Sequence, residues 1–484
     1  MITDELAYRI HNAFGHVPTA EQEQAIATFS SFMTDRREQA VMVLRGCAGT
    51  GKTTLAAAIV RALLSLQQKL VLMAPTGRAA KVFSLYAGQP AYTIHRRIYR
   101  QKSLESAFNL NFNAAHDTLF IVDEASMIAN QGSHDTPFAG GMLLDDLISF
   151  VYNGNNCRLL LIGDHAQLPP VGEEESPALM AYVLRGYGLH VFECDLNEVL
   201  RQSSESGILY NATMIRHIET VQLPKIDFGF PDIRCVPGDE LIEQLASSYS
   251  HAGLDDTLVI TRSNKRANIY NQGIRNSILD REEELCTGDR LMIVKNNYHW
   301  VHQAERPSST DNPTAGIASL SFIANGDLAV VRRVRHVHQQ YGFRFAEVTM
   351  TLPDYDDYEL TAMVLLDTLT AEAPALTREQ QELLFNAVMA DYADIPLKTD
   401  RLKKVKEDRY YNALQVKFAY AATCHKAQGG QWAHVYVDQG YMTDDMLSPG
   451  YFHWLYTAFT RATEQLFLVN WPKSQTLDAE ADAD

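Results

Sequence analysis

The chain has 484 residues, of which 46% are hydrophobic and 21% charged, with a formal net charge of −17. This is the composition of an ordinary globular protein, and the length predicts about two to four domains. Because no apolar run could span a bilayer and no signal-peptide pattern opens the chain, we expect a cytoplasmic protein without a membrane partner. The six cysteines lack C-x-x-C spacing, which disfavours zinc and a disulfide scaffold.

The first 200 residues alternate apolar strand candidates with helical stretches, a rhythm that predicts a parallel sheet wrapped by helices. The expected strands are 41–44, 70–74, 119–122, 158–162 and 190–194. Two short runs, 99–102 and 107–113, flank a turn at 103–106 and predict a small hairpin insertion.

A second strand rhythm occupies the other half of the chain, at 258–260, 415–421, 435–437 and 466–469. Between these strands, β-rich runs at 290–294, 328–333 and 344–350 predict a small antiparallel barrel. Residues 377–412 read as helical and charged, and the last residues form an acidic tail. The second α/β domain is therefore expected to be split by an insertion.

Residues 46–53 read Gly-Cys-Ala-Gly-Thr-Gly-Lys-Thr, a complete phosphate-loop motif between an expected strand and an expected helix. In such a loop, backbone N–H groups and the helix N-terminus surround phosphate oxygens. Lys52 would reach the β- and γ-phosphates, and the hydroxyl of Thr53 would bind Mg²⁺. The sequence therefore predicts a nucleoside triphosphate and Mg²⁺ as cofactors.

Two further strands end in polar side chains. The strand at 119–122 leads into Asp123 and Glu124, which could hold Mg²⁺ and activate the attacking water, respectively. The strand at 158–162 leads into Gly-Asp-His-Ala-Gln-Leu-Pro-Pro-Val, residues 163–171, where Gln167 could contact the γ-phosphate. An ordinary turn is the alternative for each segment, but the upstream phosphate loop makes it less favoured for Asp123 and Glu124.

The order and the residues of five segments resemble those of superfamily 1 helicases, most closely the RecD/Dda group called superfamily 1B. These segments are the phosphate loop, Asp-Glu-Ala-Ser at 123–126, the 163–171 segment, Thr-Cys-His-Lys-Ala-Gln-Gly at 423–429 and Leu-Tyr-Thr-Ala-Phe-Thr-Arg-Ala at 455–462. The resemblance covers residues 18 to 470. It implies an α/β fold of two RecA-like parallel-sheet domains, the second interrupted by a small SH3-like barrel, with a short hairpin, or pin, inserted in the first.

The resemblance also implies roles for individual residues. Gln22 matches the glutamine that reads the adenine edge, and Arg201 and Arg461 match two arginine fingers. The expected catalytic residues are Lys52, Glu124, Gln167, Arg201 and Arg461, and the expected metal ligands are Thr53 and Asp123. The expected ATP-binding residues are Gln22, Gly46, Cys47, Ala48, Gly49, Thr50, Gly51, Lys52, Thr53, Thr54, Arg201, Gly429 and Arg461. The expected DNA-binding residues are Pro75, Thr76, Arg78, Thr93, His95, Thr261, Asn264, Thr423 and His425. Phe108 or Phe112 could form the wedge of the pin, although such a residue is more often just part of the core.

The expected domains follow from the same resemblance. Residues 1–95 and 119–200 form the first RecA-like domain, 96–118 the pin, 201–288 and 414–475 the second RecA-like domain, 289–413 the barrel with its helical insertion, and 476–484 the tail. The implied function is an ATP-dependent 5′→3′ helicase that moves, as a monomer, on single-stranded and forked DNA. An RNA helicase, the motor subunit of a recombination nuclease and a non-unwinding ATP switch remain alternatives.

Overall fold

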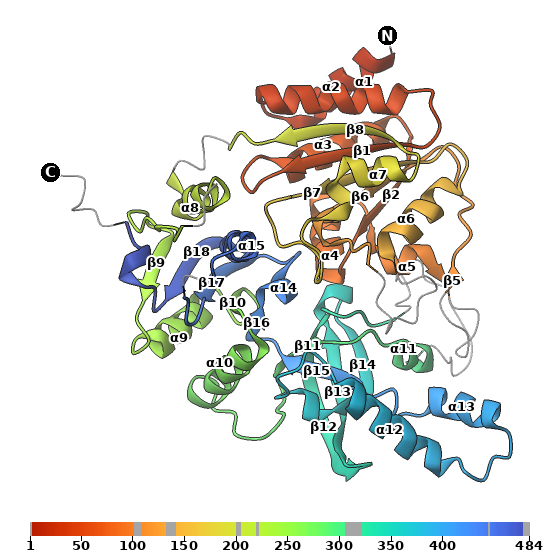
Figure 1. Ribbon diagram of the computed structural model, residues 1–484, viewed down its shortest axis with the longest axis vertical. Coiled ribbons are helices and arrows are strands. Elements are labelled where there is room, and N and C mark those ends of the chain that lie inside the picture. The colour runs from red at the N-terminus through yellow and green to blue at the C-terminus, as the bar shows by residue number, and fades with distance from the viewer. Residues whose placement is uncertain are drawn as a thin grey trace. The chain divides into compact units, whose positions relative to one another are not determined.

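The computed structural model describes residues 2–100, 109–131, 142–199, 205–218, 222–304, 322–443 and 446–477 (Figure 1). The chain divides into two compact units. Unit 1 comprises Met1–Arg100, Phe108–Thr257 and Ala427–Asp484, and unit 2 comprises Gln101–Ala107 and Leu258–Lys426.

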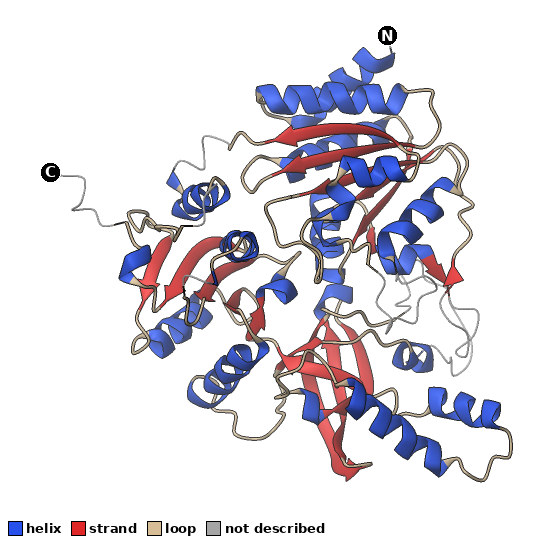
Figure 2. Cartoon of the chain, viewed as in Figure 1, coloured by secondary structure: helices blue, strands red, loops and turns tan. Residues whose placement is uncertain are grey.

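Unit 1 contains a six-stranded parallel sheet in the order β3-β2-β6-β7-β1-β8 (Figure 2). Its strands are β1 (Ala40–Gly46), β2 (Lys69–Ala74), β3 (Ala91–Thr93), β6 (Thr118–Val122), β7 (Arg158–Gly163) and β8 (His190–Leu196). Five of them are the strands that the sequence predicts. The sixth, β3, has three residues, too few to show a strand period.

Alternate residues of these strands build the core on one face of the sheet, as the two-residue period of a strand requires. Met42 and Leu44 of β1, together with Leu160 and Ile162 of β7, pack in one buried cluster with residues of α1, α2 and α3. The helices of this part of the chain are α1 (Ile2–Phe14), α2 (Ala20–Thr34), α3 (Lys52–Ser65), α4 (Gly77–Ala87), α5 (Ile94–Ile98), α6 (Leu143–Tyr152) and α7 (Ala181–Gly186), with the 3₁₀ turns η1 (Ala125–Met127) and η2 (Pro177–Leu179).

The base of the predicted hairpin is present in unit 1. Strands β4 (Tyr99–Arg100) and β5 (Asn109–Leu110) pair antiparallel. The expected turn at 103–106 and the candidate wedge Phe108 lie outside the described residues. Phe112 is 77% exposed, so it is not a core residue. The first predicted residues of the insertion, 96 to 98, are instead the end of helix α5.

A second group of parallel strands completes unit 1, with β9 (Ile233–Val236) and β17 (Trp432–Asp438) on either side of β18 (Ala462–Val469). Helices α8 (Gly207–Arg216), α9 (Leu241–His251) and α15 (Pro449–Phe459) and the turn η7 (Lys473–Gln475) accompany them. Helix α15 has a well-defined N-terminus because Ser448 caps it and Pro449 occupies its first position.

Unit 2 is built around a closed five-stranded barrel. Its strands are β11 (Arg290–Ile293), β12 (Leu328–Gln340), β13 (Phe343–Leu352), β14 (Tyr358–Leu365) and β15 (Leu414–Phe418). The other elements of the unit are the parallel pair β10 (Thr257–Thr261) and β16 (Ala421–Thr423), the helices α10 (Asn264–Ser277), α11 (His299–Ala304), α12 (Arg378–Asp391), α13 (Lys398–Glu407) and α14 (Cys424–Ala427), and the 3₁₀ turns η4 (Pro353–Tyr355) and η5 (Leu366–Thr368).

The barrel corrects one prediction. The run 415–421, predicted as one strand of the second parallel sheet, forms two strands that pair differently. Residues up to Phe418 close the barrel against β11 and β14, and Ala421 begins β16 beside β10. Both pieces are apolar and short, and strand partners are a non-local property, so the sequence pattern cannot separate them. The predicted helical stretch at 377–412 is present as α12 and α13.

The predicted α/β class is therefore confirmed, with parallel sheets and a barrel insertion. The expected domain boundaries stay a prediction, and the two compact units do not coincide with them. In the described part of the chain, no helix is both long and apolar enough to cross a membrane.

Candidate nucleotide-binding site

The phosphate loop lies in unit 1, between the end of β1 and the start of α3. Gly49 and Gly51 both have φ of +78°, a left-handed conformation that favours glycine. Gly46 has no room for a side chain, since an added Cβ would lie 2.6 Å from Cγ of Lys52. The glycines of the motif are thus needed to shape the loop, and α3 begins directly after it with its N-terminus toward the loop.

Lys52, the first residue of α3, folds back over the loop. Its ammonium donates a 2.9 Å hydrogen bond to the carbonyl of Cys47 and lies 3.9 Å from Oδ2 of Asp164. Asp164 follows β7, which is the neighbour of β1 in the sheet, with Arg45 and Gly163 in register. The parallel pairing therefore brings the phosphate loop and the 163–171 segment to one edge of the sheet, as expected for motifs that follow adjacent parallel strands.

Asp123 and Glu124 follow β6, the other neighbour of β7. Burial and the adjacent charge of Glu124 raise the pKa of Asp123, and the nearby Lys52 opposes that rise. Oδ1 of Asp123 accepts a hydrogen bond from the backbone N–H of Glu124, whose φ is +52°. The predicted carboxylate pair is thus at the same sheet edge as Lys52. The oxygen donors of Asp123 and of Thr53, the second residue of α3, suit a hard cation such as Mg²⁺.

Gln22, the predicted adenine reader, contacts the phosphate loop directly. Its amide Nε2 donates to the carbonyl of Thr50 at 2.9 Å, and its Oε1 accepts from the N–H of Thr19. Thr19 and Gln22 form the capping box of α2. The side chain therefore holds the loop to α2 in this structure, with both ends of its amide engaged.

Gln167 is 5% exposed, and its Oε1 has no hydrogen-bond partner among the described residues. Together with His165 and His453, it lines a cavity of about 500 Å³ in unit 1. A buried amide oxygen of this kind is available to a ligand or water.

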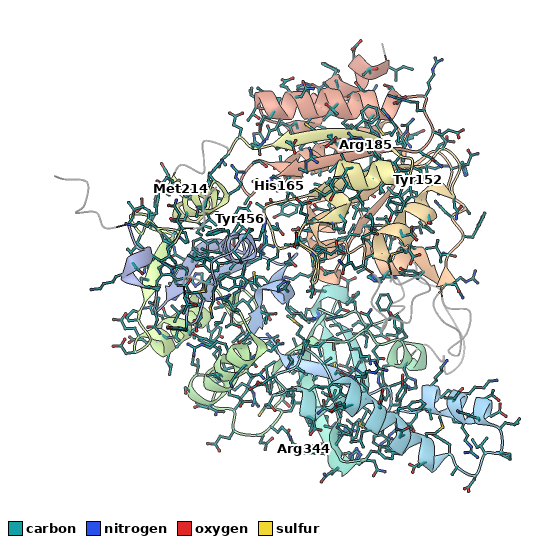
Figure 3. All side chains as sticks on the ribbon, viewed as in Figure 1. Tyr152, His165, Arg185, Met214, Arg344 and Tyr456 are labelled. Atoms are coloured by element: carbon teal, nitrogen blue, oxygen red, sulfur yellow. The ribbon has the colours of Figure 1, made fainter. Side chains whose placement is uncertain are left out.

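Helix α15, which carries most of the 455–462 segment, contacts both the phosphate loop and the 163–171 segment, through residues to which the sequence analysis gives no individual role. The hydroxyl of Tyr456, a side chain labelled in Figure 3, accepts a 2.8 Å hydrogen bond from the N–H of Ala48 in the phosphate loop and donates a 2.6 Å bond to Asp164. Thr457 Oγ1 accepts from the N–H of Leu168 at 2.8 Å. Gln428, in the 423–429 segment, donates to the carbonyl of the same Leu168. The motifs locate these segments, but they do not show which polar side chain makes which contact.

Of the two predicted arginine fingers, only Arg461 is among the described residues. Arg201 lies outside the described residues. Arg461, two residues beyond α15, is 3% exposed, and its guanidinium donates to the carbonyls of Thr457 and Gly430 at 3.1 Å each. One of these partners, Thr457, also bonds to Leu168 of the 163–171 segment.

Two other predicted ATP-binding residues lie away from the loop glycines. Gly429 packs against the start of α4, since an added Cβ would be 3.1 Å from Ala79 and from Thr76. Thr54 is on the exposed side of α3. The structure does not bring Gly429 into contact with the phosphate loop through any described hydrogen bond.

The predicted DNA-binding residues of unit 1 lie at helix starts. Thr76 caps α4 and Thr93 caps α5, each through its side chain, and Pro75 precedes the first cap. Arg78 donates to the carbonyl of Gln431 and stacks on Trp432, with its guanidinium 4.1 Å from the ring centre. His95, in α5, is partly buried, and desolvation lowers its pKa to about 4.

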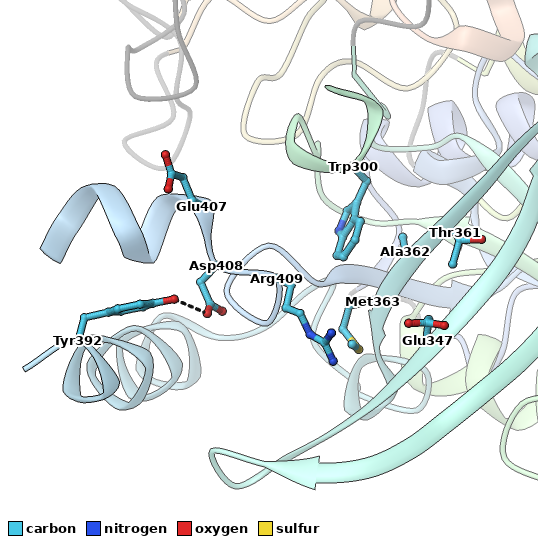
Figure 4. A pocket seen from close by; sticks show the side chains of 9 residues that line it. All are labelled: Trp300, Glu347, Thr361, Ala362, Met363, Tyr392, Glu407, Asp408 and Arg409. Atoms are coloured by element: carbon cyan, nitrogen blue, oxygen red, sulfur yellow. Dashed lines mark hydrogen bonds between the residues drawn. The ribbon is translucent and has the colours of Figure 1, made fainter. Parts of the chain in front are cut away.

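In unit 2, Thr261 and Thr423 end the paired strands β10 and β16 and are partners in register. Asn264 begins α10, and His425 is in α14, where burial and Lys426 lower its pKa. A separate cavity of about 500 Å³ lies between the barrel and the helices α12 and α13; it contains no predicted site residue (Figure 4). Trp300, Glu347, Tyr392 and Asp408 are among the residues that line it. Tyr392 donates a 2.9 Å hydrogen bond to Asp408.

Comparisons with known proteins found two family models, several sequence relatives and solved structures that resemble this chain. Residues 18–221 match the family model of an AAA domain, and residues 418–469 match that of the UvrD-like helicase C-terminal domain. The ATP-dependent DNA helicase dda of Enterobacteria phage T4 is 24% identical over 404 residues, covering 80% of this chain and 85% of the relative. The ATP-dependent RecD2 DNA helicase of Deinococcus radiodurans is 28% identical over 273 residues, covering 54% of this chain and 34% of the relative. Among solved structures, the Pif1 helicase from Candida albicans aligns with 96% of this chain and 97% of its own, at 15% identity and a TM-score of 0.46.

Proposed function

The chain belongs to the superfamily 1B helicases of the RecD/Dda type, and we propose from this premise that it is an ATP-dependent 5′→3′ DNA helicase. The observation that carries the proposal is the convergence of three segments on Lys52. The phosphate loop, the residues after β6 and the 163–171 segment follow neighbouring strands of one parallel sheet. Ligands bind at this edge in open α/β sheets, and its residues suit phosphoryl transfer to water.

In the proposed reaction, Lys52 turns from the Cys47 carbonyl to the β- and γ-phosphates, and the loop amides donate to phosphate oxygens. Glu124 orients and deprotonates the attacking water, and Gln167 contacts the γ-phosphate. Thr53 and Asp123 would hold Mg²⁺, which neutralises charge on the phosphates when it is bound. Hydroxyl and carboxylate oxygens fit this cation, and the half-buried Asp123 already lies near the positive charge of Lys52.

We assign adenine recognition to Gln22 and charge stabilisation to Arg201 and Arg461, as the family resemblance implies. Gln22 would exchange its bond to the Thr50 carbonyl for the base, and Arg461 would leave one of its two carbonyl partners. Neither change alters the number of hydrogen bonds, since each lost bond is replaced by one to the nucleotide. Arginine is suited to the second role because its planar guanidinium pairs with two phosphate oxygens.

The proposed substrate is single-stranded DNA, including the tails of a forked duplex, gripped mainly by its backbone. The residues assigned to this contact are Pro75, Thr76, Arg78, Thr93, His95, Thr261, Asn264, Thr423 and His425. Backbone contacts predict binding that tolerates any sequence and weakens with salt. We propose that one chain suffices for stepping.

The proposal is tested by ATP hydrolysis in the presence of poly-dT, poly-U or no nucleic acid. A DNA motor is expected to hydrolyse ATP several times faster with poly-dT than with either alternative. Stronger stimulation by poly-U would instead identify an RNA motor. Equal rates in all three samples would contradict a motor function altogether, and would be the result expected of a non-unwinding ATP switch.

A further inference from the structure

Arg216, the last residue of α8, has a buried guanidinium nitrogen without a partner. Its Nη1 makes no hydrogen bond to any described residue. A guanidinium is always charged and carries five N–H donors, so an unpaired buried nitrogen costs stability. Such a group is retained in a fold when something else supplies its acceptor.

The surroundings of Arg216 are those of the phosphate loop. Burial and the Asp164 carboxylate raise the pKa of the Cys47 thiol, whereas Arg216, within hydrogen-bonding range of that thiol, and Lys52 oppose the rise. Arg216 also acts electrostatically on His165, in the 163–171 segment. Ligand atoms of Cys47, Asp164 and His165 lie within 4.8 Å of one another. The guanidinium is therefore next to the point where these two segments meet.

Helix α8 is held firmly in this place. Ser206 caps it and donates to Asp232 at 2.6 Å, and Asp232 also accepts from the N–H of Gly207. Leu209 packs on the loop, since an added Cβ on Gly49 would lie 3.2 Å from its methyl carbon. Asn211 donates to the carbonyl of Asp227. The backbone that carries Arg216 is thus fixed against the phosphate loop, which favours a defined position of its side chain.

We propose that Arg216 contacts a phosphate of the bound nucleotide. The inference rests on the proposed function, because it adds a residue to the same site. A polyphosphate in the loop would bring acceptor oxygens beside the unpaired guanidinium, and arginine–phosphate bonds are among the stronger hydrogen bonds of proteins. Neither the motifs nor the family resemblance points to this residue, which ends a helix of unremarkable composition.

The test compares Arg216→Met and Arg216→Lys with the parent chain, by titrating the full-length protein with a fluorescent N-methylanthraniloyl-ADP and Mg²⁺. We expect Arg216→Met to weaken binding about tenfold, as for loss of a charged hydrogen bond. Arg216→Lys keeps the charge, so its nucleotide affinity should lie between those of Arg216→Met and the parent. The matched control is Arg185→Met, which removes an arginine that is 58% exposed and paired with Glu193, and which should bind as the parent does.

Thermal unfolding without nucleotide separates this role from a structural one. Because Arg216→Met removes a charged group whose buried Nη1 has no partner among the described residues, its Tm without nucleotide should equal or exceed that of the parent, while the rise in Tm on adding ADP should shrink. A lower Tm with unchanged nucleotide affinity would overturn the proposal. If Arg216→Met does not fold, an unchanged affinity of Arg216→Lys would overturn it equally. A parent chain that binds no nucleotide would overturn the proposed function, and this inference with it.

Discussion

The hydroxyl of Tyr456 joins the phosphate loop to Asp164, with hydrogen bonds of 2.8 Å from the Ala48 N–H and 2.6 Å to Oδ2 of the carboxylate. Tyr456 is 2% exposed, so water cannot easily replace either bond. The same carboxylate oxygen is the one nearest the ammonium of Lys52. One tyrosine of α15 therefore sets the resting arrangement of the two segments that the nucleotide must contact.

Tyr456→Phe should loosen this arrangement. Removing the hydroxyl leaves a buried N–H and a buried carboxylate oxygen each short of one partner, which should lower the free energy of unfolding by about 1 to 3 kcal/mol. Amide hydrogen exchange should speed up in residues 46–51 in particular. Tyr436→Phe is the control, because Tyr436 bonds to Ser248 and Gln244 instead. Equal exchange of the loop in the parent and Tyr456→Phe would show that the hydroxyl does not hold it.

Lys52→Ala should abolish ATP hydrolysis while leaving binding of single-stranded DNA nearly unchanged. The ammonium of Lys52 is the positive charge with which the phosphate loop would bind the phosphates. Loss of such a contact costs several kcal/mol of transition-state stabilisation, or about 100-fold or more in rate. Steady-state hydrolysis and fluorescence anisotropy with a labelled oligonucleotide measure the two properties. Full turnover by this variant would mean that the phosphate loop is not the catalytic site.

Glu124→Gln should bind nucleotide but hydrolyse it slowly, because the amide keeps the shape of the side chain and cannot accept the proton of water. We expect a fall of about 100- to 10,000-fold in kcat, the usual range for a general base. Single-turnover hydrolysis, with nucleotide affinity measured in parallel, checks this. Turnover equal to the parent would remove Glu124 from the role of base.

Asp327 should make the stability of the barrel depend on pH. Burial raises its pKa from 3.8 to about 7, against hydrogen bonds from Ala324 and Tyr355 that favour the charged form. Because the folded pKa is above the unfolded one, this contribution to stability is complete below pH 3.8 and is lost as the pH rises through about 7. Its size is on the order of a few kcal/mol.

Asp327→Asn is the variant that checks this dependence, since it keeps the shape and cannot ionise. Urea unfolding between pH 5 and 8 should show stability falling with pH in the parent more steeply than in the variant. Parallel curves for the two proteins would contradict the assignment. Asp354→Asn is a useful comparison because the charge of Asp354 contributes to the raised pKa of Asp327.

The sequence predicts those parts of the molecule that are encoded locally. The glycines of the phosphate loop and the apolar strands before Asp123 and Asp164 carry strong short-range signals, and the structure places all three at one sheet edge. By contrast, the run 415–421 has the pattern of one strand and forms two, because strand partners depend on residues far away in the chain.

Tyr456 and Arg216 show the same limit at the site. Each contacts a segment more than 150 residues away, and although Tyr456 lies in the 455–462 segment, no local pattern in the sequence marks either residue for its contact. His95 is predicted to contact DNA from its place in a motif, and this stays a prediction; its partly buried ring has a pKa that desolvation lowers to about 4. Motifs fix a backbone position, and packing decides which way a side chain points.

The most direct test of the proposed function is unwinding of a duplex with a single-stranded tail on either the 5′ or the 3′ side, with ATP and Mg²⁺. Opening each base-pair step costs on the order of 1.4 kcal/mol of stacking, a load that hydrolysis can meet. We predict strand separation of the 5′-tailed duplex only, and none by Lys52→Ala. Separation of the 3′-tailed duplex alone, or of neither substrate by a chain that binds both tails and hydrolyses ATP, would contradict the account.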